Sequence, residues 1–105
     1  MLHHDLIRNG KKGALADSEQ LLAIVQPRRQ VKAIVWGHTH VWKISRDVSG
    51  IFLVNLPATG FTLWGRSFLG WVGCQVYRDN AMLRVHAFDA GQKEDGLAYQ
   101  LRWRV

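Results

Sequence analysis

Four of the five histidines in this sequence fall into two tight clusters. One pair, His3 and His4, stands next to the N-terminus, and a second pair, His38 and His40, closes the segment Trp-Gly-His-Thr-His. Histidine is the commonest metal-ligating side chain, and clustered imidazoles are the raw material of a transition-metal site. The spacing therefore predicts a metal centre to which both clusters contribute.

The elements around these histidines predict how the clusters meet. Residues 1–3 are typical of the end of a strand, and the apolar run 31–36 is typical of a strand buried on both faces. Between them a helix follows Asp17, which predicts a capping box with Gln20, and ends before Pro27. Such a strand–helix–strand crossover sets two parallel strands side by side, so that both clusters emerge at one edge of the sheet.

Two details of this unit are also predicted. Within the helix, Leu21, Ile24 and Val25 share one face, which we expect to pack against the sheet. After the buried strand, Gly37 is expected to let the backbone turn sharply and to present the two following histidines to one site.

The rest of the chain is rich in strand patterns. Segments 42–48 and 51–56 flank a Ser-Gly pair and predict one hairpin. Segments 71–78 and 81–88 flank an Asp-Asn pair and predict a second hairpin, and residues 99–103 are typical of a last edge strand. In the segment 81–88, alternate residues predict one apolar face and one mixed face.

The order of elements predicts a single domain, residues 1–105, with a β-rich α/β fold and one main helix. One helix is too few to cover both faces of layered sheets. The chain is therefore expected to be part of something larger or half of a dimer.

The composition bears on the cellular compartment in which the protein is expected and on the classes of partner it is expected to bind. The single cysteine, Cys74, cannot form an intrachain disulfide and is expected to be a small buried side chain. There is no readable signal peptide and no apolar run of transmembrane length, so a cytoplasmic protein without membrane contact is favoured. Lysine and arginine give a net charge of +6 but are spread along the chain. These residues are therefore expected to form a solvated basic surface, and attraction of anionic substrates such as phosphate esters is the functional alternative. Nucleic acid is not an expected partner, and a basic nucleic-acid binder is kept as a third hypothesis.

Other residues are assigned lesser roles. Asn55 is expected to stabilise a turn, His86 to face solvent or a neighbouring sheet, and Trp36 to belong to the core. In the long loop 57–69, Arg66 is expected to take part in loop packing, with phosphate binding at a pocket rim as the alternative.

Taken together, these motifs resemble the C-terminal half of the calcineurin-like metallophosphoesterases. The stretch His3-His4-Asp5 stands where that family has His-His-Pro, and residues 37–40, Gly-His-Thr-His, match its Gly-His-x-His motif. The segment Gly50–Gly60, which ends in Asn-Leu-Pro-Ala-Thr-Gly, is similar to the family's next strand and its Asn-x-Pro-type turn. The resemblance covers nearly the whole chain.

This resemblance implies part of an α-β-β-α sandwich that carries a two-metal centre for phosphoester hydrolysis. In that pattern His3 and His38 bind one divalent ion of manganese, iron or zinc, and His40 binds the second. A hydroxide between the two ions attacks phosphorus. His4 is usually not the primary ligand and is assigned a catalytic, substrate-facing role.

Three further motifs of the family are missing from this sequence: Asp-x-His, Gly-Asp-x-x-Asp, whose first aspartate bridges the metals, and Gly-Asn-His followed by an acidic residue. Neutral imidazoles do not neutralise two adjacent cations, so this chain is expected to hold at most one ion and to be incomplete as an enzyme. The expected partners are a phosphate-ester substrate and either an N-terminal half or a homo-oligomer. The alternative is a non-catalytic metal-binding module that associates with itself.

Overall fold

The computed structural model describes residues 1–6, 14–62 and 67–105. The described residues form one helix, α1 (Ser18–Val25), and the strands β1 (Ala33–Trp36), β2 (Lys43–Arg46), β3 (Phe52–Asn55), β4 (Gly70–Val76), β5 (Asn80–Ala87) and β6 (Ala98–Arg102). Across these ranges, no helix has the length and apolarity needed to span a membrane.

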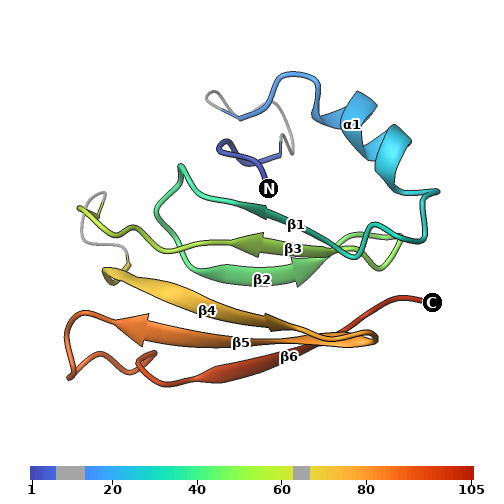
Figure 1. Ribbon diagram of the computed structural model, residues 1–105. Coiled ribbons are helices and arrows are strands. Elements are labelled where there is room, and N and C mark those ends of the chain that lie inside the picture. The colour runs from blue at the N-terminus through green and yellow to red at the C-terminus, as the bar shows by residue number, and fades with distance from the viewer. Residues whose placement is uncertain (7–13, 63–66) are drawn as a thin grey trace.

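The elements stack in three layers (Figure 1). The helix α1 and the N-terminal residues lie on one face of a three-stranded sheet of order β1-β3-β2, and the sheet β4-β5-β6 lies on its other face. Strands β1 and β3 are parallel, β2 is antiparallel to β3, and the second sheet is antiparallel throughout. The predicted β-rich α/β sandwich with one main helix is confirmed.

The N-terminal residues run beside β1 without forming a regular strand. The backbone N–H of Leu2 donates to the carbonyl of Val35 at 2.7 Å, and that of Gly37 donates to the carbonyl of His3 at 3.2 Å. His3 therefore lies at the end of β1 from which the second histidine cluster emerges, as the crossover predicted.

The first sheet separates two hydrophobic cores. On the helix side, the buried cluster consists of Leu6, Ile34, Trp36, Ile51 and Leu53. Between the sheets, it consists of Phe52, Val54, Leu83 and Leu101. Successive residues of β3 alternate between the two cores, and all four are buried. The prediction that β1 is covered on both faces, with Trp36 in the core, is confirmed, because Ala33 and Val35 pack toward the second sheet.

The start of α1 differs from its prediction. Asp17 occupies the N-cap position, but its side chain makes no capping hydrogen bond, so the predicted capping box with Gln20 is wrong. The hydroxyl of Ser18, which is buried, instead donates to the carbonyl of Leu15. A buried hydroxyl needs a partner, and the chain before the helix supplies it.

The buried face of α1 is also rotated from the predicted one. Leu21, Leu22 and Val25 pack against the core, whereas Ile24 is 53% exposed. Leu22 and Ile24 are both apolar, so a helix of eight residues permits two overlapping apolar stripes. In the structure Leu22 packs on the helix-side core, to which Leu2 and Leu15 also pack, and Ile24 does not.

Both predicted hairpins form, and β6 pairs as the last edge strand. In β5, Ala81, Leu83 and Val85 are buried, and Leu83 belongs to the core between the two sheets. His86 points the other way and stacks on Trp71, with ring centroids 4.0 Å apart. The predicted alternation of β5 is confirmed, and His86 lies on the outer face of the second sheet.

Cys74 is exposed, so the prediction that it is buried is wrong. It pairs in register with Leu83, whose side chain belongs to the core between the sheets. Val76, two residues later on the same face of β4, is 71% exposed. This end of β4 therefore has no cover among the described residues.

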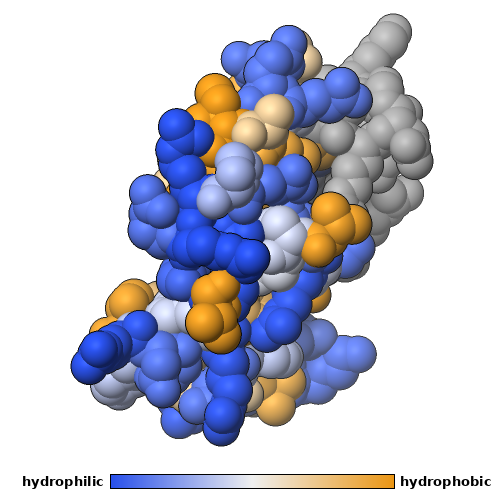
Figure 2. Space-filling model, turned by 90° about the vertical axis from the view of Figure 1, so that its right-hand side faces the viewer, coloured by the Kyte–Doolittle hydropathy of each residue, from blue (hydrophilic) through white to orange (hydrophobic). Residues whose placement is uncertain are grey.

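The C-terminal segment ties the layers together at the end of the molecule opposite the β1 loop (Figure 1). The Arg104 guanidinium donates at 2.6–3.3 Å to the backbone carbonyls of Val25, Gln26, Arg28, Val31 and Ser49. It thereby satisfies carbonyls at the end of α1 and joins them to the β2–β3 turn. Figure 2 views this end, where hydrophilic side chains dominate and hydrophobic ones form small separate groups.

Candidate metal centre

The histidines that follow β1 lie in an unusual loop. Both His38, with φ of 64°, and His40, with φ of 58°, have a left-handed backbone, which is uncommon outside glycine. Gly37 is not among the residues with positive φ, so its predicted role in the sharp turn is wrong. The histidines themselves make the turn, and backbone strain of this kind gathers at functional sites.

Asn55 holds this loop from the end of β3. Its Nδ2 donates to the hydroxyl of Thr39, which stands between the two histidines. Asn55 is 8% exposed, and its Oδ1 has no hydrogen-bond partner among the described residues. The structural role predicted for Asn55 is confirmed in the form of this contact.

Three histidines come together at the end of β1. One ring nitrogen from each of His3, His4 and His38 lies within 4.8 Å of the other two. His3 Nε2 and His38 Nδ1 are 3.3 Å apart, and the ring centroids of His4 and His38 are 4.1 Å apart. The predicted meeting of the two clusters at one sheet edge is therefore confirmed for these residues.

His40 lies outside this group of three. Its ring packs edge-on against Phe61, at 4.8 Å between centroids, and its Nδ1 is buried without a hydrogen-bond partner in the described part of the chain. It nevertheless lines a cavity of about 310 Å³ together with His3, His38 and the segment 56–61. The donor distances and the cavity thus define two sets of three histidines, which share His3 and His38 and differ in the third member.

Several solved structures are similar to this chain in fold. A dimetal phosphatase from Danio rerio matches with a TM-score of 0.67 and 14% identity, over 88% of this chain and 26% of that chain. Vps29 from Entamoeba histolytica in complex with Zn²⁺ matches with a TM-score of 0.58 and 16% identity, over 99% of this chain and 53% of that one. Vps29 from Chaetomium thermophilum gives a TM-score of 0.59 and 14% identity, over 98% and 52%.

This chain therefore shares its fold with part of the dimetal phosphatase and with part of the two Vps29 chains. The chain spans about half the length of the two Vps29 chains and about a quarter of the phosphatase chain. No family model and no curated protein matches the sequence. At these identities the likeness concerns the fold alone.

The spacing of His3 and His38 fits one shared ion. Zinc–nitrogen bonds of about 2.0–2.1 Å and a tetrahedral angle separate two ligating nitrogens by about 3.3 Å, and His3 Nε2 and His38 Nδ1 are 3.3 Å apart. No acidic side chain of the described residues belongs to the group. Two divalent ions a few ångströms apart repel strongly unless an anion lies between them. The described residues therefore fit one ion and not two.

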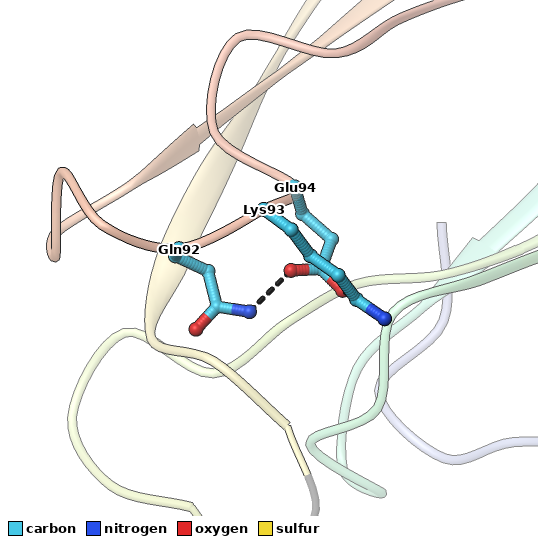
Figure 3. Close-up of polar contacts among 3 residues, drawn as sticks. All are labelled: Gln92, Lys93 and Glu94. Atoms are coloured by element: carbon cyan, nitrogen blue, oxygen red, sulfur yellow. Dashed lines mark hydrogen bonds and ion pairs between the residues drawn. The ribbon is translucent and has the colours of Figure 1, made fainter.

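A loop of the second sheet lies beside the segment that follows His40. Its residues Gln92, Lys93 and Glu94 line, with Val41 and Trp42, a cavity of about 340 Å³. The amide of Gln92 donates to one carboxylate oxygen of Glu94, and Lys93 Nζ lies 3.9 Å from the other oxygen (Figure 3). The Glu94 carboxylate is thus engaged within its own loop and does not complete the histidine group.

Two other residues bear on the site. Arg66, for which phosphate binding was the alternative role, lies outside the described residues. Phe61 was not singled out by sequence, yet it contacts His40 and is 62% exposed. Its position in the sequence could have indicated this contact. Phe61 directly follows the Pro-Ala-Thr-Gly segment, which comes after β3, and β3 is parallel to β1 and ends at the same edge of the sheet.

Proposed function

We propose that this chain is the C-terminal portion of a metal-dependent phosphoesterase and supplies histidine ligands to a dinuclear metal centre. The observation that carries the proposal is the 3.3 Å approach of His3 and His38 from two separate segments at the end of β1. It is supported by the likeness in fold to a dimetal phosphatase and to Vps29 in complex with Zn²⁺. In this assignment His3 and His38 hold one ion and His40 holds the second.

When bound, the ions supply the chemistry of phosphoester hydrolysis, because they polarise the phosphoryl group and activate water. The residues of this chain position the ligands and the substrate. Asn55 holds the loop through Thr39, and the cavity between the histidines and the segment 56–61 has room for a phosphoryl group. His4, 4.1 Å from His38 between ring centroids, is the proposed catalytic group that faces the substrate.

The same proposal makes the chain incomplete by itself. A bridging carboxylate is needed between two ions, and the histidine group has none among the described residues. The chain also covers only 53% of a Vps29 chain. We therefore propose a carboxylate-bearing N-terminal half as partner, a phosphate ester as substrate, and manganese, iron or zinc as the metal.

The DNA that precedes the codon of Met1 tests this proposal. We expect the in-frame extension to encode Asp-x-His, Gly-Asp-x-x-Asp and Gly-Asn-His. The extended protein, supplied with Mn²⁺ or Zn²⁺, is expected to hydrolyse p-nitrophenyl phosphate or its diester. His38→Ala should abolish turnover, and His86→Ala, on the far sheet, should leave it unchanged. An extended protein that folds, binds metal and hydrolyses neither ester would overturn the proposal.

A second candidate is a non-catalytic metal-binding module that associates with itself. It is favoured by the apolar side chains that the second sheet leaves exposed, Trp71 and Val76 on the edge strand β4 and Phe88 after β5. Edge strands with exposed apolar side chains promote pairing between copies. This candidate predicts a metal-bound dimer in light scattering that becomes monomeric in the Trp71→Ser/Val76→Lys variant. A wild-type monomer at high micromolar concentration would exclude it.

A further inference from the structure

We infer that this chain by itself binds a single zinc-class ion through His3, His4 and His38, with His40 outside the coordination sphere. The inference rests on the proposed function only in assigning an ion to His3 and His38. It adds a role that the family pattern does not give, because His4 becomes a ligand whenever carboxylates from elsewhere are absent.

The donor distances favour His4 as the third ligand. All three nitrogens lie within 4.8 Å of one another, which exceeds the edge of a tetrahedral zinc site by about 1.5 Å at most. His3 and His4 are both exposed, so small rotations within their rotamer wells bring the nitrogens onto one ion without displacing core side chains.

The surroundings of His40 disfavour it as the third ligand of the same ion. Its ring is held by Phe61, and its Nδ1 faces the protein interior. Its backbone is left-handed and follows Thr39, which Asn55 anchors. Moving His40 toward the other donors would require the loop to change conformation. His40 is thus available to a second ion that needs further ligands, and not to the first.

The donor set selects the class of metal. Three neutral imidazoles suit Zn²⁺ and Co²⁺, whereas Mg²⁺ and Ca²⁺ prefer oxygen ligands, which this group lacks. Three protein ligands on a tetrahedral ion leave one position for water or a small anion, as in catalytic zinc sites. The exposure of His3 and His4 keeps that position open to solvent.

Cobalt spectroscopy on the 105-residue chain tests the inference. For this experiment the chain is produced with a short N-terminal extension, because a free amino group two residues before a histidine can itself bind metal ions together with backbone nitrogens. Co²⁺ titration is expected to give one ion per chain with the visible bands of a tetrahedral site, and Zn²⁺ to displace it. His4→Ala should weaken Zn²⁺ binding at least tenfold, while the matched variant His40→Ala should stay within twofold of the wild type.

The outcomes separate this inference from the proposed function. If His40→Ala weakens Zn²⁺ binding as much as His38→Ala while His4→Ala does not, the inference is overturned, because His40 and not His4 then completes the site. If the folded chain, checked by circular dichroism, binds neither Co²⁺ nor Zn²⁺, the inference is overturned, whereas hydrolysis by the extended protein still tests the proposed function. In that extended protein, His4→Ala should lower turnover and leave metal content unchanged.

Discussion

The two ends of the stacked sheets differ in how far their polar groups are hydrogen-bonded. At one end, a single guanidinium, that of Arg104, satisfies five backbone carbonyls. At the other end lie all three buried side-chain atoms that lack a hydrogen-bond partner among the described residues: Trp36 Nε1, His40 Nδ1 and Asn55 Oδ1. Both left-handed histidines also lie there.

This difference indicates what each end is for. Folded proteins pair nearly all buried polar groups, and the exceptions need a reason. Trp36 and Asn55 border a cavity of about 280 Å³, and His40 borders the one beside the other histidines. The Arg104 end therefore satisfies its backbone carbonyls, whereas the histidine end leaves buried polar atoms unpaired beside the metal site that we propose.

The largest expected effect separates binding from stability at the histidine end. His38→Gly removes a ligand and should lower Zn²⁺ affinity by at least about 100-fold. It also relieves the left-handed backbone, so the unfolding free energy without metal should rise by about 1 kcal/mol. Calorimetric titration and urea unfolding in a chelator measure the two quantities. If the variant lost both Zn²⁺ affinity and stability, the statement that His38 lowers the stability of the histidine end would be wrong.

The next effect concerns the opposite end. Arg104→Ala removes the hydrogen bonds that join the end of α1 to the β2–β3 turn, although the Val25 carbonyl keeps the Arg28 backbone N–H. The variant should lower the unfolding free energy by about 2–3 kcal/mol. Arg104→Lys should recover only part of this, because an ammonium lacks the planar fork of donors. Zn²⁺ affinity should be unchanged in both variants. A fall in affinity that matched the fall in stability would mean that the two ends are not separable.

A smaller effect is expected where the loop is anchored. Asn55→Leu removes the contact to Thr39 together with the unpaired Oδ1, so stability should change little while Zn²⁺ affinity falls about tenfold. Thr39→Val removes the same hydrogen bond from the other side and serves as the matched control. Equal affinity in the wild type and both variants, measured by cobalt competition, would exclude Asn55 as a positioning residue.

The smallest effect is the pH dependence of the Arg104 end. Burial raises the pKa of Asp47, but hydrogen bonds from Gln26, Ser49 and Ile51 outweigh it and leave the pKa below the usual value. A lowered pKa in the folded state stabilises the protein above the unfolded pKa of about 4, and this contribution is lost as pH falls through the folded value. Urea midpoints between pH 5 and pH 2, at about half-unit steps, should therefore fall less in Asp47→Asn than in the wild type. Parallel profiles would contradict this.

Local pattern was enough to predict the strands, both hairpins and the meeting of His3 with His38. Alternating apolar residues and turn residues indicate where strands lie. A strand–helix–strand connection is almost always right-handed, and its two parallel strands end at the same edge of the sheet. The errors concern features that depend on neighbours. The exposed thiol of Cys74 depends on which strands cover β4, and the choice between Leu22 and Ile24 depends on how the helix is rotated.

The sequence also could not predict which histidine joins His3 and His38 in the group of three, and the reason is related. Residue spacing places His38 and His40 in one loop, but the direction of each ring depends on backbone angles of 64° and 58° and on the contact between Thr39 and Asn55. Gly37 offered a simpler account of the same turn. A left-handed conformation at histidine has no reliable sequence signal, because asparagine, aspartate and glycine adopt it as well.

The exposure of the only thiol in the chain has a practical consequence. A single pyrene maleimide attached to Cys74 would sit beside the uncovered part of β4. Excimer fluorescence would then appear only when two labelled copies bring their edges together, and it would disappear when another polypeptide occupies that edge.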